Sequence, residues 1–339
     1  MRPSPLGSVC RMRFRLLPWQ PDYGSAVQFA AEPKDGAEDV PLAVLGAENR
    51  AWAPVTPNVE APIAVIVDGV RRTDAIVLSA EPGRGSVFGL FGTFAVGAVR
   101  CDGVARVLHE HTRVQRTFFY TGSSSEIPDR FMRSGSAQLA YQSESREDAA
   151  SASDLQNALH SAMRFAEARL SESLSEDESV LTLVDGPLRS LRSPGRHTVG
   201  FIKRQHQMYL STEEQELLWT LDVGERTPLF EIPAAAGKGY ATDRLSWFVR
   251  LARIGTAFHP HGELMRLEAT PGIPPSEAVA LADQSAKILP RLASSPIRDP
   301  RAPQNLTPVG ALENHLTHLM GDRRLIHRML AASLALDTD

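Results

Sequence analysis

The sequence predicts an α/β protein in which a mixed sheet is buried between helices. Two strongly apolar runs each lead into an Asp-Gly pair: residues 63–67 precede Asp68, and residues 180–184 precede Asp185. Apolar runs of this length are typical of strands that are buried on both faces. Between them, residues 154–174 carry apolar side chains at helical spacing, which predicts an amphipathic helix. These patterns together indicate a sheet whose faces are covered by helices.

Composition and cysteine content place few constraints on the protein. The chain has 339 residues, of which 42% are hydrophobic and 22% charged, as in an ordinary soluble domain. The two cysteines, Cys10 and Cys101, are too few for a disulfide framework. Arginines at 11, 13 and 15 interrupt any apolar segment near the start, so the sequence predicts neither a signal peptide nor a membrane span. We therefore expect a cytoplasmic protein.

The chain divides into an extension and one large domain. Residues 1–60 are rich in Pro, Gly and Ala and are interpreted as an N-terminal extension, with a possible strand or a contact to a dimer or another partner. Residues 61–332 form the main domain, which closes with C-terminal helices at 276–289 and 308–332, the latter interrupted at Gly321. The expected strands, in order, are 63–67, 72–78, one or two within 87–99, 114–120, 180–184, 198–202, 245–254 and 264–269. The polar residues 142–153 are expected to form a loop, and Asp154 is expected to be the N-cap of the helix that follows.

The repeated Asp-Gly pattern predicts a cation site. Asp68 is expected where the first buried strand ends, with Gly69 allowing a sharp turn, and Asp185 is expected at the end of a second buried strand. If the two strands are parallel neighbours, their carboxylates meet at one end of the sheet. The alternative is that each Asp-Gly pair is a simple turn.

A third carboxylate and a lysine extend this pattern. Glu167 lies at the rim of the apolar stripe of the helix between the strands, and it either reaches the sheet end or pairs with Arg164 on the surface. Carboxylates are the ligands that Mg²⁺ and Mn²⁺ prefer, and two such ions can promote phosphodiester hydrolysis. Lys203, at the exit of strand 198–202, either holds a phosphate or is solvated.

A basic stretch follows Asp185. The net charge of the chain is -4, but residues 186–207 contain five basic residues and no acidic one. We predict that the arginines of this stretch contact a DNA backbone; the alternative is a solvated basic loop. These predicted DNA-binding residues are Arg189, Arg192, Arg196 and Arg204. The sequence has no GxxxxGK[ST] phosphate loop, so any work along DNA requires a separate ATPase.

The order of these segments resembles the NurA family of nucleases. The resemblance covers about residues 60–325 and lies in Val67-Asp-Gly-Val-Arg71, Met163-Arg-x-x-Glu167, Leu183-Val-Asp-Gly-Pro-Leu188, Val199-Gly-Phe-Ile-Lys-Arg204 and Pro303-Gln-Asn-Leu-Thr-Pro-Val309. It implies an RNase H-like (Piwi-like) core, cleavage of DNA with Mn²⁺ or Mg²⁺, and a homodimer. It also implies partnership with a HerA-type hexameric ATPase in DNA-end resection.

The resemblance also assigns roles to individual residues. It implies that Asp68, Glu167 and Asp185 are metal ligands and that Lys203 contacts the phosphate. The family usually has a histidine in its last motif, where alignment on Pro303 and Leu306 places Gly310. Three nearby residues remain candidates for its replacement: Asn305, Glu313 and His315.

The function that follows is a metal-dependent nuclease acting on DNA ends. One alternative is a catalytically weak DNA-binding or scaffold subunit for a translocase, which the missing histidine favours and the intact carboxylate trio opposes. Another is a hydrolase of a small phosphorylated substrate, but the acid-free basic stretch is longer than such a substrate needs.

Overall fold

The structure is a computed structural model. It describes residues 48, 50–81, 85–122, 129–134, 137–188, 195–203, 209–232, 243–255, 260–270, 272–295, 297 and 302–336. The strands are β1 (Ala64–Glu81), β2 (Gly85–Cys101), β3 (Ala105–Val107), β4 (Arg113–Thr121), β5 (Arg130–Ser134), β6 (Ala137–Arg146), β7 (Leu181–Asp185), β8 (Thr198–Ile202), β9 (Phe230–Ile232), β10 (Arg244–Arg250) and β11 (Leu264–Ala269). The helices are α1 (Ala152–Leu174), α2 (Thr212–Thr220), α3 (Pro275–Leu292), α4 (Thr307–Leu319) and α5 (Arg323–Leu336). Short 3-10 turns cover His109–His111 and Pro260–Glu263.

All the described strands belong to one mixed sheet. Its order is β5-β6-β4-β2-β1-β7-β8-β11-β10-β9, with β3 added to β2. The pairs β1–β7, β7–β8 and β4–β6 are parallel, and the other pairs are antiparallel. The α/β class and the mixed sheet flanked by helices, both predicted from the sequence, are therefore confirmed.

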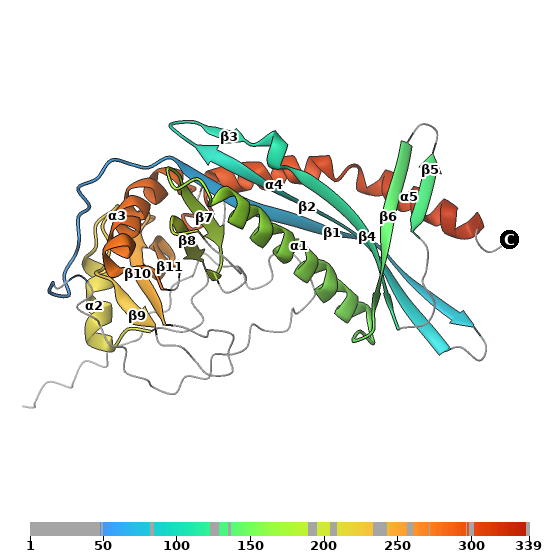
Figure 1. Cartoon of the computed structure of the whole chain (residues 1–339), viewed down its shortest axis with the longest axis horizontal. Coiled ribbons are helices and arrows are strands. Elements are labelled where there is room, and N and C mark those ends of the chain that lie inside the picture. Colours follow the sequence, from blue (N-terminus) through green and yellow to red (C-terminus); the bar gives the residue numbers. More distant parts are fainter. Residues whose placement is uncertain are drawn as a thin grey trace, which may run out of the picture.

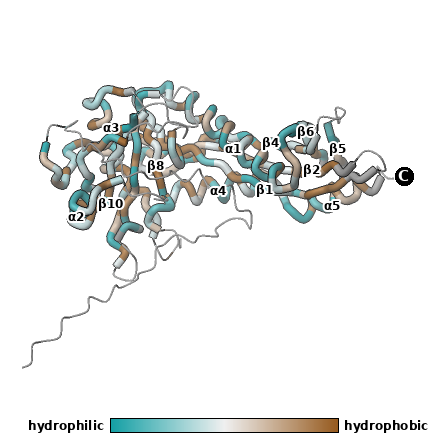
Figure 2. The backbone as a smooth tube through the Cα atoms, turned by 90° about the horizontal axis from the view of Figure 1, so that it is seen from below, coloured by the Kyte–Doolittle hydropathy of each residue, from teal (hydrophilic) through white to brown (hydrophobic). Residues whose placement is uncertain are grey.

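The long hairpin of β1 and β2 gives the molecule its elongated shape. In Figure 1 it runs from the wide part, which holds α2 and α3, to a narrow end formed with β5, β6 and α5. Helix α1 crosses one side of this hairpin, and α4 runs along the other. Figure 2 shows the same wide and narrow ends from below.

Alternation along β1 defines which helix covers which face. Ala64 and Ile66 are buried in a cluster with the apolar residues of α3 and α4. Val65 and Val67 are buried in a second cluster that includes Leu170 of α1. Because alternate side chains of a strand point to opposite faces, even-numbered residues of this part of β1 face α4 and odd-numbered ones face α1.

The expectation that the first strand ends at Asp68 is wrong. β1 continues to Glu81, because β2 pairs with it in antiparallel register through Asp68↔Gly97 and beyond, with one register shift between Thr73 and Ala75. The polar residues of the second half are also satisfied: the Arg72 Nε–Asp74 Oδ1 distance is 2.7 Å, and the Tyr141 hydroxyl donates to Asp74 at 2.9 Å. β1 therefore extends beyond its apolar run because β2 pairs with it and because side chains distant in the sequence bind its polar residues.

Two other local predictions need correction, and several are confirmed. The N-cap of α1 is Ser151, and Asp154 is its third helical residue, returning a hydrogen bond in a capping box. Residues 142–146 belong to β6 and not to a loop. The predicted strands 198–202 and 264–269 are confirmed as β8 and β11, and Gly321, with φ +84°, separates α4 from α5 as predicted.

The described end of the predicted N-terminal extension packs on the main domain. The indole of Trp52 donates to the Glu214 carbonyl at 3.0 Å, and Val55 pairs with Arg226 in an isolated bridge. The part of the extension before residue 48 lies outside the described residues. Among the helices that the structure describes, none is both long and apolar enough to span a membrane.

Candidate functional site

The two aspartates of the repeated pattern lie on neighbouring parallel strands. β1 and β7 pair from Ala64↔Leu181 to Val67↔Val184, and Asp68 and Asp185 are the next residues on each strand. β7 ends at Asp185, whereas β1 continues. By alternation, both carboxylates belong to the face that α4 covers. The predicted meeting of the two aspartates is thus a consequence of register, although only one strand ends there.

Asp68 is a buried carboxylate of the site. Its residue is 7% exposed, and its Oδ2 atom is buried without a hydrogen-bond partner. Burial raises the pKa of this carboxyl well above its usual value; Lys203 opposes the rise, and the charges of Glu167, Asp185 and Glu313 add to it. A buried oxygen surrounded by other carboxylates is a place where a cation is stabilised.

Lys203 supplies a positive charge at this place. Its Nζ atom lies 2.8 Å from Oδ2 of Asp185 and 5.3 Å from the centre of the Phe201 ring. Burial acts to lower the pKa of this lysine, but the charges of Asp185, Asp68 and Glu313 outweigh it and raise the pKa. The ammonium group is therefore held in its charged form beside the carboxylates.

Glu167 approaches β1 from the other face of the sheet. It belongs to the buried stripe of α1, four residues after Met163, and is 7% exposed. The position that a Cβ atom would take on Gly69 is only 2.6 Å from Oε1 of Glu167. The carboxylate thus lies directly over the strand backbone, in space that only glycine leaves open.

Arg164 connects Glu167 with Asp185. Its Nη1 atom lies 3.3 Å from Glu167 Oε2 and donates to the Asp185 carbonyl at 3.2 Å. Burial raises the pKa of Glu167 to about 6; Arg164 lowers it and Asp185 raises it. The pairing of Glu167 with Arg164 is therefore present, although Glu167 is buried and not on the surface, and the charge of Asp185 also acts on Glu167.

The turn after Asp185 is fixed by backbone contacts. Gly186 has φ +89°, and its N–H donates to the Phe201 carbonyl at 3.0 Å. The Leu188 N–H donates to Oε1 of the buried Glu268 at 2.8 Å. These contacts tie the turn to β8 and β11 and so position Asp185. The sequence pattern did not indicate Glu268, whose partner is 80 residues away.

Of the three candidates for the missing histidine, Glu313 is the one whose charge acts on the site. Its charge acts on both Asp68 and Lys203. The ring of His315 instead lies 5.3 Å from that of His109. Asn305 lies beside Gly310, where an added Cβ would be 3.8 Å from its amide nitrogen. The sequence left these three residues undecided because it does not show how α4 packs.

The residues present fit a divalent cation in charge and donor type. The fit rests on the unpartnered buried oxygen of Asp68 and on the carboxylates of Glu167, Asp185 and Glu313 around it. In the part of the chain that the structure describes, no three acidic, histidine or cysteine side chains are already arranged as a complete metal site. The counter-charges at Asp185 and Glu167 are Lys203 and Arg164.

Only one of the four predicted DNA-binding arginines lies among the described residues. Arg196 has a side chain that is 64% exposed, and it forms an ion pair with Glu277 at 3.0 Å. Arg189, Arg192 and Arg204 lie outside the described residues. Two other basic residues act on Glu167: Arg164, which the sequence indicated as its possible partner, and Arg71, to which the sequence assigned no role.

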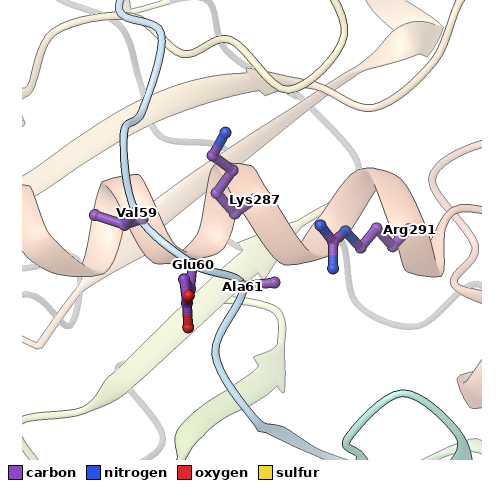
Figure 3. A pocket seen from close by; sticks show the side chains of 5 residues that line it. All are labelled: Val59, Glu60, Ala61, Lys287 and Arg291. Carbon is purple, nitrogen blue, oxygen red and sulfur yellow. The ribbon is translucent and has the colours of Figure 1, made fainter.

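A surface pocket lies at the opposite end of the β1–β7 ladder. Val59, Glu60 and Ala61 cross α3 there, beside Lys287 and Arg291 (Figure 3). Asp68 follows the ladder, whereas these residues precede it. The pocket therefore does not belong to the carboxylate site.

Comparisons of the sequence with protein-family models and with curated proteins give no match.

Proposed function

We propose that this protein is a metal-dependent deoxyribonuclease that acts on DNA ends. One observation carries the proposal: the buried, unpartnered Oδ2 of Asp68 lies among the carboxylates of Asp185 and Glu167, beside the ammonium group of Lys203. Acidic side chains from strand, helix and strand, together with a cation, suit phosphodiester hydrolysis.

The roles of the residues follow from their positions. Asp68, Glu167 and Asp185 would hold Mn²⁺ or Mg²⁺, the ions that prefer oxygen ligands. When bound, such ions activate a water molecule and stabilise the leaving oxygen of a phosphodiester. Lys203 would then contact the scissile phosphate, and the positive charges of Arg71 and Arg164 next to Glu167 favour a polyanionic substrate.

The resemblance to the NurA family extends the proposal to partners. It implies an RNase H-like homodimer that resects DNA ends with a HerA-type hexameric ATPase, and we propose that this protein acts in the cytoplasm. The mixed sheet covered by helices on both faces supports this core, and the carboxylates occur in the expected order. Because the sequence has no phosphate loop, movement along duplex DNA is left to that partner.

The test is a cleavage assay on linear and circular DNA with Mn²⁺, Mg²⁺ or EDTA. We expect the wild-type chain to degrade linear DNA with either ion and not with EDTA, and Asp68→Asn and Asp185→Asn to abolish cleavage while remaining folded. Glu216→Gln, at an exposed glutamate of α2, is the control that keeps activity. Absence of metal-dependent cleavage by the wild type refutes the proposal, and salt-dependent DNA binding without cleavage would identify the scaffold subunit instead.

A further inference from the structure

Helix α4 packs tightly on the sheet beside Asp68. The register partner of Asp68 is Gly97, and a Cβ atom on Gly97 would lie 3.1 Å from the Leu316 side chain and 3.4 Å from Leu312. α4 can approach here because Gly97 has no side chain. Glu313 follows Leu312 and precedes Leu316 by one turn, so it lies at the edge of the helix face that contacts the sheet.

The charges on this face centre on the Lys203 ammonium. Lys203 contacts Asp185 at 2.8 Å and is attracted by Asp68 and Glu313 as well. Glu167 comes from the α1 face and has a cation of its own, Arg164. Three carboxylates on one face thus act on one positive charge, and one of them, Asp68, keeps a buried oxygen without a hydrogen bond.

We propose that Glu313 is a fourth carboxylate of the metal site and that Lys203 occupies the cation position until a divalent ion displaces its ammonium group. This inference rests on the proposed function and adds two statements to it. The residue that replaces the family's histidine is an acidic ligand on α4. The lysine has two positions, one in the carboxylate cluster and one at the phosphate of the substrate.

The physical basis is competition between cations for the same oxygens. A divalent ion offers twice the charge of an ammonium group and takes six or more oxygen ligands, so it gains more from clustered carboxylates. Asp68 Oδ2 accepts no hydrogen bond, so a metal ion can use this oxygen without breaking one. When the Lys203 ammonium group leaves the cluster, its ion pair with Asp185 is lost. A contact between the metal ion and the Asp185 carboxylate takes the place of this ion pair.

The test is Mn²⁺ binding to the full chain, measured by titration calorimetry without DNA. Glu313→Gln keeps the shape of the side chain and is expected to weaken binding by at least about 10-fold, the loss that even an outer-shell partner of a metal causes. Lys203→Met removes the competing charge and is expected to strengthen binding by roughly 10-fold, a small part of the Coulomb attraction between groups about 4 Å apart near a protein surface. Glu216→Gln is the matched control and should bind as the wild type does.

The outcomes separate this inference from the proposed function. Wild-type binding of Mn²⁺ with Glu313→Gln within about two-fold of it overturns the role of Glu313 and leaves the nuclease intact. If Lys203→Met binds Mn²⁺ more weakly than the wild type does, the proposed competition between Lys203 and the metal ion is overturned. Failure of the wild type to bind Mn²⁺ overturns both proposals. Melting temperatures in EDTA complete the test, because a merely structural Glu313 would change stability without changing the affinity for Mn²⁺.

Discussion

Substitution of Gly69 by alanine tests how closely Glu167 approaches the sheet. The new Cβ atom would lie 2.6 Å from Oε1 of Glu167 and 3.1 Å from Cγ of Met163, both on α1. Overpacking of this kind costs about 1–3 kcal/mol, because the helix or the carboxylate must move. Replacing a glycine by alanine also lowers the conformational entropy of the unfolded chain, which raises the free energy of unfolding by about 0.4–1 kcal/mol. We therefore expect Gly69→Ala to lower the free energy of unfolding by about 1–2 kcal/mol.

A double-mutant cycle shows whether the carboxylate causes this loss. Urea denaturation is measured in EDTA for the wild type, Gly69→Ala, Glu167→Ala and the double variant. Without the Glu167 carboxylate, the new methyl group meets only side-chain carbons at 3.1 Å, which must shift by a few tenths of an ångström. The cost of Gly69→Ala should therefore fall by at least about 0.5 kcal/mol in the Glu167→Ala background.

Gly310 provides a matched control in α4. A Cβ atom there would meet nothing closer than the Asn305 amide nitrogen at 3.8 Å. Gly310→Ala is therefore expected to stabilise the protein by about 0.5–1 kcal/mol, the usual gain from glycine to alanine within a helix. An equal cost of Gly69→Ala with and without the Glu167 carboxylate would refute the close approach, as would a Gly69→Ala variant as stable as Gly310→Ala.

Two further predictions concern titratable groups. The pKa of Glu167 is about 6 in the folded protein and about 4.5 without the fold, so the folded chain holds this proton more tightly. In EDTA, the free energy of unfolding of the wild type should therefore fall by about 2 kcal/mol in total as the pH rises from about 3.5 to about 7, relative to Glu167→Gln. A pH profile that Glu167→Gln leaves unchanged would contradict this. Burial raises the pKa of the Cys101 thiol to about 11. A Cys10→Ser chain should consequently react with a thiol reagent at pH 8 only after denaturation, and fast reaction of the folded chain would show that Cys101 is accessible.

The sequence predicted best the elements whose apolar runs are bounded on both sides. β8 and β11 have the predicted limits because their runs begin and end at polar or turn residues. β1 was cut short because Asp68 and Gly69, which follow its apolar run, were interpreted as a turn before a second strand. The buried Asp74 is held there by Arg72, Thr93 and Tyr141, and the last two come from other strands. A pattern within one segment does not contain such partners.

The candidate site shows the same limit. The recurrence of an apolar run before Asp68 and before Asp185 predicted that the two residues would be neighbours, and the β1–β7 register places them side by side. The choice of Glu313 over Asn305 and His315 depends on how α4 approaches Gly97, which is a matter of packing between distant segments.

The site forms where β7 ends and β1 continues. Beyond Asp185, β1 keeps β2 as its neighbour but has no described strand on the β7 side, and groups from both faces act on the same point: Glu167 from α1 and Glu313 from α4. Among the described residues, the four carboxylates there face three basic groups, Lys203, Arg164 and Arg71. Buried carboxylates that outnumber the basic groups around them cannot all remain charged without a further cation. The raised pKa values of Asp68 and Glu167 reflect the free-energy cost of keeping these carboxylates charged. Under the proposed function, a divalent ion would remove this cost without a proton, and we therefore expect the site to bind the metal at neutral pH.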